Sequence, residues 1–269
     1  GARDMGATIL RFTPATGVSR ENGEWIVHTE KGDIRCEIVV NAAGYYAQKV
    51  GEWFKPFGGR TVPMMVMSHQ YLLSEPIAEI EAWSKEVGHK LPLLRDVDSS
   101  YYLRQEKTGF NLGPYEKNCR AHWVNPDDPF PEDFSFQLFP DDLDRLEWYI
   151  EDAMARVPLL GTAGISKVIN GPIPYAPDGN PLIGPMPGVP NAFEACVFTF
   201  GIAQAGGAGK VLAEWVTEGA TEWDMWSCDP RRYTDYADPQ YCVDKGMEIY
   251  GHEYAMHFPG TLFPYTTLF

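Results

Sequence analysis

The sequence predicts an α+β fold, built from antiparallel strand hairpins and a few helices. Strand-like runs rich in Val, Ile, Thr and Tyr occur over residues 7–44 and 61–116, separated by Gly and Asn turns. Two longer segments, 140–158 and 204–218, have the apolar spacing and the end signals of helices. Together these patterns favour separate strand-rich and helical parts.

Size and charge limit the classes of function. The chain has 269 residues, which suits one large or two modest domains, and 44% of them are hydrophobic. Its formal net charge is -15, which argues against nucleic acid and anionic membrane surfaces as partners. No apolar run approaches the length of a membrane span.

Cysteine and histidine spacings exclude several kinds of site. Five cysteines occur without a C-x-x-C pair, so we expect reduced thiols rather than a zinc ribbon. The six histidines show no H-x-x-x-H spacing, so we expect no catalytic metal.

The first third of the chain predicts strands. Residues 7–12 read as a strand, and residues 25–40 read as a hairpin with its turn at Lys31–Gly32. The apolar run "EIVVNAAG" ends in small residues at Gly44. Such a turn is common where a ligand meets the carboxyl edge of a sheet.

The middle of the chain predicts a second hairpin and a helix. After a short helix within 46–60, residues 99–116 read as two strands around Lys107–Thr108–Gly109. Residues 125–136 are rich in Pro and Asp and predict a loop. The helix within 140–158 is expected to be capped by Asp141 or Asp142 and stopped by Pro158.

The stretch "FGIAQAGGAGK", residues 200–210, is a small-residue turn that leads into a helix. It does not match the P-loop pattern, because Lys210 is followed by Val211, and its third glycine fails the dinucleotide fingerprint. Two interpretations stay open, an anion-binding helix start and close packing of helix on strand. Gly206 and Gly209 are expected to serve packing, because they lie within the helix.

Two polar groups stand out among the strands. His69 lies in an apolar run, where it is either a hydrogen-bonded core residue or a proton-handling group aimed into a cavity. Tyr102 and Arg104 share one strand face, so they could clamp a carboxylate or simply form a solvated face.

Six segments in one order carry a family resemblance. They are "VVNAAGYYA", "SHQYLLSEP", "PLLRDVDSSYYLRQE", "GFNLGPYE", "PDGNPLIGPMPGVPNAF" and "FGIAQAGGAGKVLAEW". With "WDMWSCDPRRY" and "YAMHFP" after them, they resemble the D-amino-acid-oxidase-like superfamily of FAD-dependent oxidoreductases, and within it the dimethylglycine and sarcosine dehydrogenase branch. The resemblance covers roughly residues 1–258.

The resemblance implies a discontinuous FAD-binding domain over 1–50 and 165–220, an antiparallel-sheet substrate domain over 51–164, and the start of a C-terminal extension over 221–269. The N-terminal Rossmann half, with its strand–G-x-G-x-x-G–helix unit, is missing from the sequence. The opening "GARDMGA" and the tail "GTLFPYTTLF" read as a fragment cut at both ends.

The resemblance also assigns site residues. It places FAD contacts at Val18, Ala42, Ala43, Gly44, Gly201, Ile202, Ala203 and Gln204. It implies that the loop from Gly201 faces the pyrimidine edge of the flavin, where backbone N–H groups favour the reduced ring. It matches His69 and Tyr102 to a polar catalytic pair, with Tyr102 preferred over Tyr101. Ser68 stands where some relatives are expected to have an acidic residue.

The implied reaction is FAD-dependent oxidative demethylation of a secondary or tertiary N-methyl amino acid, with hydride transfer to flavin N5. The alternatives are another flavin amine oxidase of the superfamily and an inactive, cofactor-free piece. Tetrahydrofolate is implied only through a C-terminal domain that this sequence lacks. The expected location is the cytoplasm of a bacterium, or the mitochondrial matrix in a eukaryote.

Overall fold

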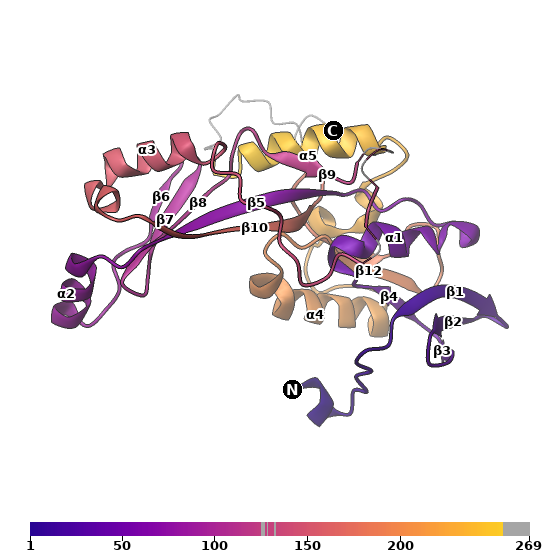
Figure 1. The fold of residues 1–269 in the computed structure, drawn as a ribbon. Coiled ribbons are helices and arrows are strands. Elements are labelled where there is room, and N and C mark those ends of the chain that lie inside the picture. Colours follow the sequence, from indigo (N-terminus) through magenta and orange to yellow (C-terminus); the bar gives the residue numbers. More distant parts are fainter. Residues whose placement is uncertain (125–126, 128, 132, 255–269) are drawn as a thin grey trace. The chain divides into compact units, whose positions relative to one another are not determined.

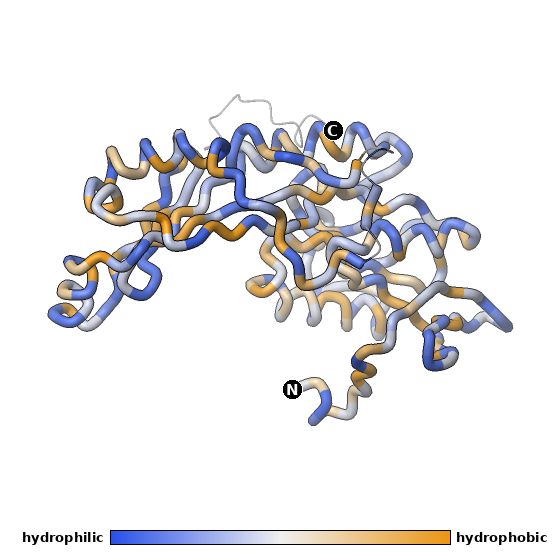
Figure 2. Tube along the Cα trace, viewed as in Figure 1, coloured by the Kyte–Doolittle hydropathy of each residue, from blue (hydrophilic) through white to orange (hydrophobic). Residues whose placement is uncertain are grey.

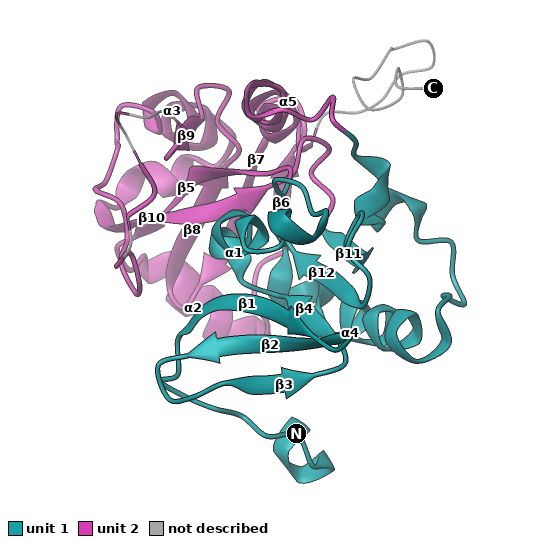
Figure 3. Ribbon diagram, turned by 90° about the vertical axis from the view of Figure 1, so that its right-hand side faces the viewer, with its two compact units in different colours: residues 1–62, 181–234 teal, residues 63–180, 235–269 magenta. Residues whose placement is uncertain are grey.

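The computed structural model describes residues 1–124, 127, 129–131 and 133–254. The chain divides into two compact units, which Figure 3 colours separately. Unit 1 comprises residues 1–62 and 181–234, and unit 2 comprises residues 63–180 and 235–269. Helices and antiparallel strands occur in both units, which confirms the α+β prediction. The division into FAD-binding, substrate and C-terminal domains stays a prediction.

Unit 1 has two small sheets and two α-helices, which are labelled in Figure 3 and, except for β11, in Figure 1. The strands are β1 (Ala15–Glu21), β2 (Glu24–Thr29), β3 (Ile34–Cys36), β4 (Val39–Asn41), β11 (Leu182–Pro185) and β12 (Ala192–Cys196). The helices are α1 (Ala47–Glu52) and α4 (Gly201–Glu218). One sheet has the order β1-β2-β3 and the other has the order β11-β12-β4.

The hairpin β2–β3 forms where the sequence predicts it. The amide of Gly32 donates to the carbonyl of Thr29 at 3.2 Å, and Gly32 has a positive φ of 118° that favours glycine. By contrast, residues 7–12 form no strand, and the Phe12 side chain is 81% exposed. A strand depends on a hydrogen-bonding partner, and no described strand pairs with this segment.

In its described residues, unit 2 has a six-stranded antiparallel sheet and three α-helices. The strands are β5 (Met65–Ser74), β6 (Leu94–Asp96), β7 (Tyr101–Glu106), β8 (Gly109–Pro114), β9 (Arg120–His122) and β10 (Ile165–Tyr175). The helices are α2 (Ala78–Val87), α3 (Glu147–Arg156) and α5 (Pro239–Gly251). The strand order is β10-β5-β8-β7-β6, with β9 paired to β5. Polar and apolar residues succeed one another along β10 in Figure 2.

The predicted hairpin β7–β8 is also confirmed. Glu106 pairs with Gly109, so Lys107 and Thr108 form a two-residue turn. Lys107 has a positive φ of 53°, which this tight connection requires.

The two faces of the unit 2 sheet carry different cores. On the α2–α3 face, Leu72 and Leu112 pack in one cluster with Ile80 of α2 and Tyr149 of α3. On the α5 face, Met67 packs with Tyr250 of α5. The Asp238 side chain caps the start of α5 by accepting from the Tyr241 amide at 2.8 Å. Because strand residues alternate between faces, His69 of β5 shares the α5 face with Met67, whereas Ser68 and Gln70 share the α2–α3 face with Leu72.

Helix α3 begins later than predicted, because tertiary contacts hold the preceding backbone. Its N-cap is Leu146, so neither Asp141 nor Asp142 caps it. The Gln70 side chain accepts from the Asp142 amide at 3.0 Å and donates to the Asp142 carbonyl at 3.1 Å. The second bond occupies the Asp142 carbonyl, which a helix capped at Asp141 or Asp142 would use as an acceptor in its first turn.

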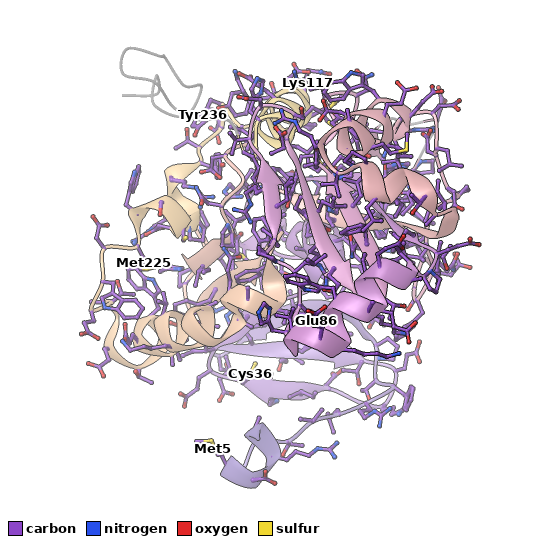
Figure 4. The ribbon with its side chains drawn as sticks, turned by 90° about the vertical axis from the view of Figure 1, so that its left-hand side faces the viewer. Met5, Cys36, Glu86, Lys117, Met225 and Tyr236 are labelled. Carbon is purple, nitrogen blue, oxygen red and sulfur yellow. The ribbon has the colours of Figure 1, made fainter. Side chains whose placement is uncertain are left out.

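The remaining predictions concern α4, the cysteines and two segments that the structure does not fully describe. Helix α4 begins at Gly201 rather than at residue 204, and Gly219, which follows its last residue Glu218, caps it with φ +72°. All five cysteines are free thiols, as expected, and Figure 4 labels Cys36 on β3. The predicted loop at 125–136 lies partly outside the described residues, and residues 255–269, with most of "YAMHFP", lie wholly outside them.

Candidate active site

One edge of the β11-β12-β4 sheet gathers most of the predicted cofactor contacts. Strands β4 and β12 run parallel, with Val39 opposite Ala192 and Asn41 opposite Glu194. Because parallel strands end at the same edge, the turn after β4 and the connection from β12 into α4 lie at one edge of unit 1. In α/β sheets that carboxyl edge is the usual place for a ligand.

The turn after β4 is held by a buried asparagine. Asn41 is 2% exposed, and its side-chain amide donates to the Ala47 carbonyl at 2.8 Å. Its side-chain oxygen accepts from the Ala43 amide at 3.3 Å. Gly44 has φ +58°, and a Cβ there would meet nothing within 4 Å. Ala42 and Gly44 are therefore exposed on a braced turn with space beside it.

The start of α4 forms the second element of this edge. No acidic residue lies in its first turn and no side chain caps it, so its first N–H groups keep the positive end of the helix dipole uncompensated. The Gln204 amide already donates to the Phe200 carbonyl at 3.0 Å. The donors that remain for a ligand are those of Gly201, Ile202 and Ala203.

The side chains of this helix start lie toward open space. Ile202 is fully exposed, and Ala203 is exposed as well. The expected packing role of Gly206 and Gly209 is wrong, because a Cβ at either glycine would meet nothing within 4 Å. Helix α4 is instead anchored by Ala208 and Val211, which pack with Ile183 of β11.

Val18 belongs to the other sheet of unit 1, which has the order β1-β2-β3. It belongs to β1 and pairs with Val27 of β2. Its side chain packs in the cluster that contains Val39 and Ala192, the first residues of β4 and β12. Val18 is half-buried there, so part of its side chain is covered by this packing.

His69 and Tyr102 belong to unit 2, where both lie on the α5 face of the sheet. His69 is half-buried on β5, and burial lowers the pKa of its imidazole below the ordinary 6.5, with a smaller opposing effect from Glu116. A neutral imidazole at neutral pH can accept a proton. Its ring lies 5.0 Å from the Tyr115 ring and 5.7 Å from the Tyr250 ring.

Tyr102 pairs with Gly113 across the β7–β8 ladder. Burial, assisted by the neighbouring Tyr254, raises the pKa of the Tyr102 hydroxyl to about 12. The hydroxyl therefore stays protonated near neutral pH and serves as a hydrogen-bond donor rather than as a base.

Arg104 already has a carboxylate partner within the protein, which does not favour its predicted role in clamping a substrate carboxylate. Its guanidinium pairs with Glu106 on the same strand at 2.5 Å. It lines a pocket of about 540 Å³ together with Tyr71, Asn111 and Ser166, and the described lining includes neither His69 nor Tyr102. Arg104 and Tyr102 thus share a strand face without sharing this pocket.

Four residues behind His69 were missed by the sequence interpretation. A buried hydrogen-bond network joins Gln70, Glu116, Arg145 and Tyr250. Glu116 and Tyr250 are 134 positions apart, so no local spacing could indicate their contact. Ser68 belongs to the same network, because its hydroxyl accepts from Arg145 at 2.8 Å. Ser68 is 1% exposed and lies on the α2–α3 face, away from His69.

The described residues contain no group of three or more His, Cys, Asp or Glu that could hold a metal ion. The same part of the chain has no helix with the length and apolar content of a membrane span.

Comparison with known proteins identifies the family. The family described as "FAD dependent oxidoreductase" matches residues 1–215, and "FAD dependent oxidoreductase central domain" matches residues 218–265. The chain belongs to this FAD-dependent oxidoreductase family. It is 39% identical to mitochondrial dimethylglycine dehydrogenase of Homo sapiens over 96% of the chain, and 33% identical to mitochondrial sarcosine dehydrogenase of Homo sapiens over 96%.

The matches cover a limited part of each relative. The chain spans 29% of the human dimethylglycine dehydrogenase and 27% of the human sarcosine dehydrogenase. Among solved structures, it resembles the L-proline dehydrogenase from P. horikoshii with a TM-score of 0.65 and 25% identity, over 86% of this chain and 56% of that one.

The residues present in unit 1 fit the FAD that this family uses. The edge has a braced small-residue turn, an uncapped helix start without acidic residues, and exposed side chains at both. Such a surface suits a group that is electron-rich on one side and needs close backbone approach.

Proposed function

We propose that the protein carrying this sequence oxidises a small N-methylated amino acid, of the dimethylglycine or sarcosine type, with FAD as cofactor. The observation that carries the proposal is the parallel pairing of β4 with β12, which joins residues 42–44 and 201–204 at one edge of unit 1. The substrate class is supported by the names of the two human relatives.

In this proposal the discontinuous unit 1 is the part of the chain that contacts FAD. Residues 42–44 would provide a turn that permits close approach, and the amides of Gly201, Ile202 and Ala203 would donate to the bound flavin. Val18 contributes its backbone. FAD, when bound, supplies the hydride acceptor for the N-methyl carbon of the substrate.

Unit 2 supplies the groups that handle the substrate. The substrate amine has to be neutral before it can release a hydride, and His69 accepts its proton at Nε2. The Tyr102 hydroxyl, which stays protonated, donates to the substrate carboxylate and orients it. General base catalysis of this kind contributes roughly 10² to 10⁴ in rate.

The test has two steps. Purified protein should be yellow or should take up added FAD, which is measured by the flavin absorbance band per mole of protein. It should then turn over dimethylglycine or sarcosine with an artificial electron acceptor. His69→Ala should lower kcat/KM, while His252→Ala, which removes an exposed side chain bonded to a carbonyl within α5, should not. FAD uptake without turnover of any N-methyl amino acid would defeat the substrate assignment.

A second candidate is oxidation of an unmethylated amino acid, which the likeness to the L-proline dehydrogenase structure favours. The same assay with proline and glycine separates the two. Turnover of proline with none of dimethylglycine would establish the second candidate. Location stays a prediction, with the mitochondrial matrix favoured for a eukaryotic source by the names of the relatives.

A further inference from the structure

Hydrogen bonds connect His69 to two buried side chains, those of Tyr250 and Glu116. The His69 Nδ1 atom lies 2.7 Å from the Tyr250 hydroxyl oxygen, and that hydroxyl lies 2.5 Å from Oε2 of Glu116. The three residues come from β5, from α5 and from the segment after β8. Tyr250 and Glu116 are both 0% exposed, so no water shell competes for these bonds.

The last group in this series of hydrogen bonds is the Glu116 carboxylate, which accepts every hydrogen bond described for it. Oε1 of Glu116 receives the Arg145 guanidinium at 3.1 Å and the Gln70 side-chain amide at 3.2 Å. An ionised carboxylate paired with arginine has lone pairs but no proton to donate. The Tyr250 hydroxyl must therefore donate its single proton to Oε2.

The donor count then determines the protonation of His69. Once the Tyr250 proton points to Glu116, the Tyr250 oxygen can only accept, so Nδ1 of His69 must carry a hydrogen. In a neutral imidazole this leaves Nε2 as the bare nitrogen. Among the described residues, no hydrogen bond reaches Nε2.

We propose that Tyr250 and Glu116 are positioning residues that hold His69 as its Nδ1–H tautomer and so make Nε2 the proton acceptor of the proposed amine oxidation. The inference rests on the proposed function for its catalytic meaning, while the tautomer itself is independent of any reaction. The proton from the substrate amine moves to Nε2, and Nδ1 keeps its own. The resulting imidazolium is balanced by Glu116 through the Tyr250 hydroxyl, as a buried acid balances histidine in catalytic triads.

Two aromatic rings pack against the imidazole ring of His69 and restrict its orientation. The Tyr250 ring lies edge-on to the His69 ring at 84°, and the Tyr115 ring is tilted against it at 40°. The titratable or charged groups around His69 are Tyr115, Tyr250, Glu116 and Arg145. The hydrogen bond described for the His69 ring is made by Nδ1, not by Nε2.

The tautomer can be read directly by ¹⁵N NMR of histidine-labelled, FAD-loaded protein at neutral pH, with His69 assigned by its loss in His69→Gln. We expect a protonated-type resonance for Nδ1 and a bare-type resonance for Nε2. The reverse assignment would overturn the proposal, and this measurement needs no variant near the network to fold.

The matched variants are Tyr250→Phe and Tyr175→Phe. Both remove a buried hydroxyl bonded to a glutamate in the same aromatic cluster, but the Tyr175 hydroxyl bonds Glu253 and not His69. Tyr250→Phe should shift His69 toward the Nε2–H tautomer and lower kcat/KM on the order of tenfold, whereas Tyr175→Phe should leave the tautomer unchanged. An unchanged tautomer in folded Tyr250→Phe would contradict the proposal. A correct tautomer with no N-methyl amine turnover would defeat the proposed function alone.

Discussion

The ring of Tyr102 lies directly over Gly113, its partner across the β7–β8 ladder. A Cβ on Gly113 would come within 2.1 Å of Cζ and within 2.3 Å of the hydroxyl oxygen of Tyr102. Only glycine leaves room for this ring position, so the strand facing Tyr102 determines where its hydroxyl lies.

Gly113→Ala should therefore displace the Tyr102 side chain while leaving its hydroxyl intact. The ring can rotate away, so we expect a modest loss of stability, about 1–3 kcal/mol, and a larger loss of activity. The measurements are the free energy of unfolding in urea and kcat/KM for the N-methyl substrate. Tyr102→Phe is the comparison, because it removes the hydroxyl without moving the strand. Wild-type kcat/KM in Gly113→Ala would show that the position of Tyr102 is unimportant.

Gly201→Ala should weaken FAD binding without harming the fold. A Cβ at Gly201 would make ordinary contact with Phe198 at 3.4 Å, so unit 1 itself tolerates the change. The added methyl would instead occupy the approach of the flavin, at a cost of about 1–3 kcal/mol, or roughly 5- to 150-fold in Kd. Flavin titration followed by absorbance measures this.

The matched control for that change is Gly207→Ala in the same helix, where a Cβ meets nothing within 4 Å. It should keep the wild-type Kd. Equal Kd values for Gly201→Ala and wild type would remove Gly201 from the cofactor site.

Acid should destabilise the fold through His69. Because burial lowers the folded-state pKa of His69 below 6.5, the unfolded chain binds a proton more readily than the folded one. The contribution of His69 to stability is complete above the unfolded pKa and is lost as the pH falls from about 6.5 toward the folded pKa. Urea unfolding at pH 8 and pH 5.5 should show a smaller loss in His69→Gln than in wild type. An identical loss in both proteins would mean that His69 titrates normally.

Gly188→Ala should destabilise unit 1 strongly. Gly188 has φ +75°, and a Cβ there would lie 2.4 Å from the Gly58 carbonyl oxygen, a backbone atom that cannot swing away. The added strain and overlap should cost more than about 2 kcal/mol of unfolding free energy. Gly219→Ala is the control that measures the cost of the positive φ alone, because Gly219 has φ +72° with open space around it. It should lower the free energy of unfolding by only about 1 kcal/mol. Equal costs for the two variants would contradict the predicted backbone overlap.

Local signals predicted the features that local chemistry determines. The turns at Lys31–Gly32 and Lys107–Thr108 follow from glycine and short loops, and both hairpins formed. The small-residue turn after β4 was likewise readable, although its brace, Asn41, was not singled out. The family resemblance supplied the candidate site residues, which remain a proposal.

Distant contacts explain what the sequence could not show. Asp142 looks like a helix cap, but the Gln70 side chain, 72 positions away, binds its backbone instead. The sequence suggested that the glycines of α4 pack against a strand, but the residues of α4 that pack against Ile183 of β11 are Ala208 and Val211. The Glu116–Tyr250 contact that orients His69 depends in the same way on tertiary structure.

The parallel pairing of β4 with β12 has a further consequence for biosynthesis. Val39 and Ala192 are 153 positions apart, so β4 leaves the ribosome long before its partner exists. At typical elongation speeds it waits for roughly 8 to 30 s, while the β1-β2-β3 hairpins beside it can already close. During that interval the whole of β5 to β10 emerges, so unit 2 can begin to fold before the sheet beside the predicted cofactor contacts is complete. Slow assembly of this one ladder would leave a translation intermediate with an unpaired apolar strand, which is the kind of species that chaperones protect.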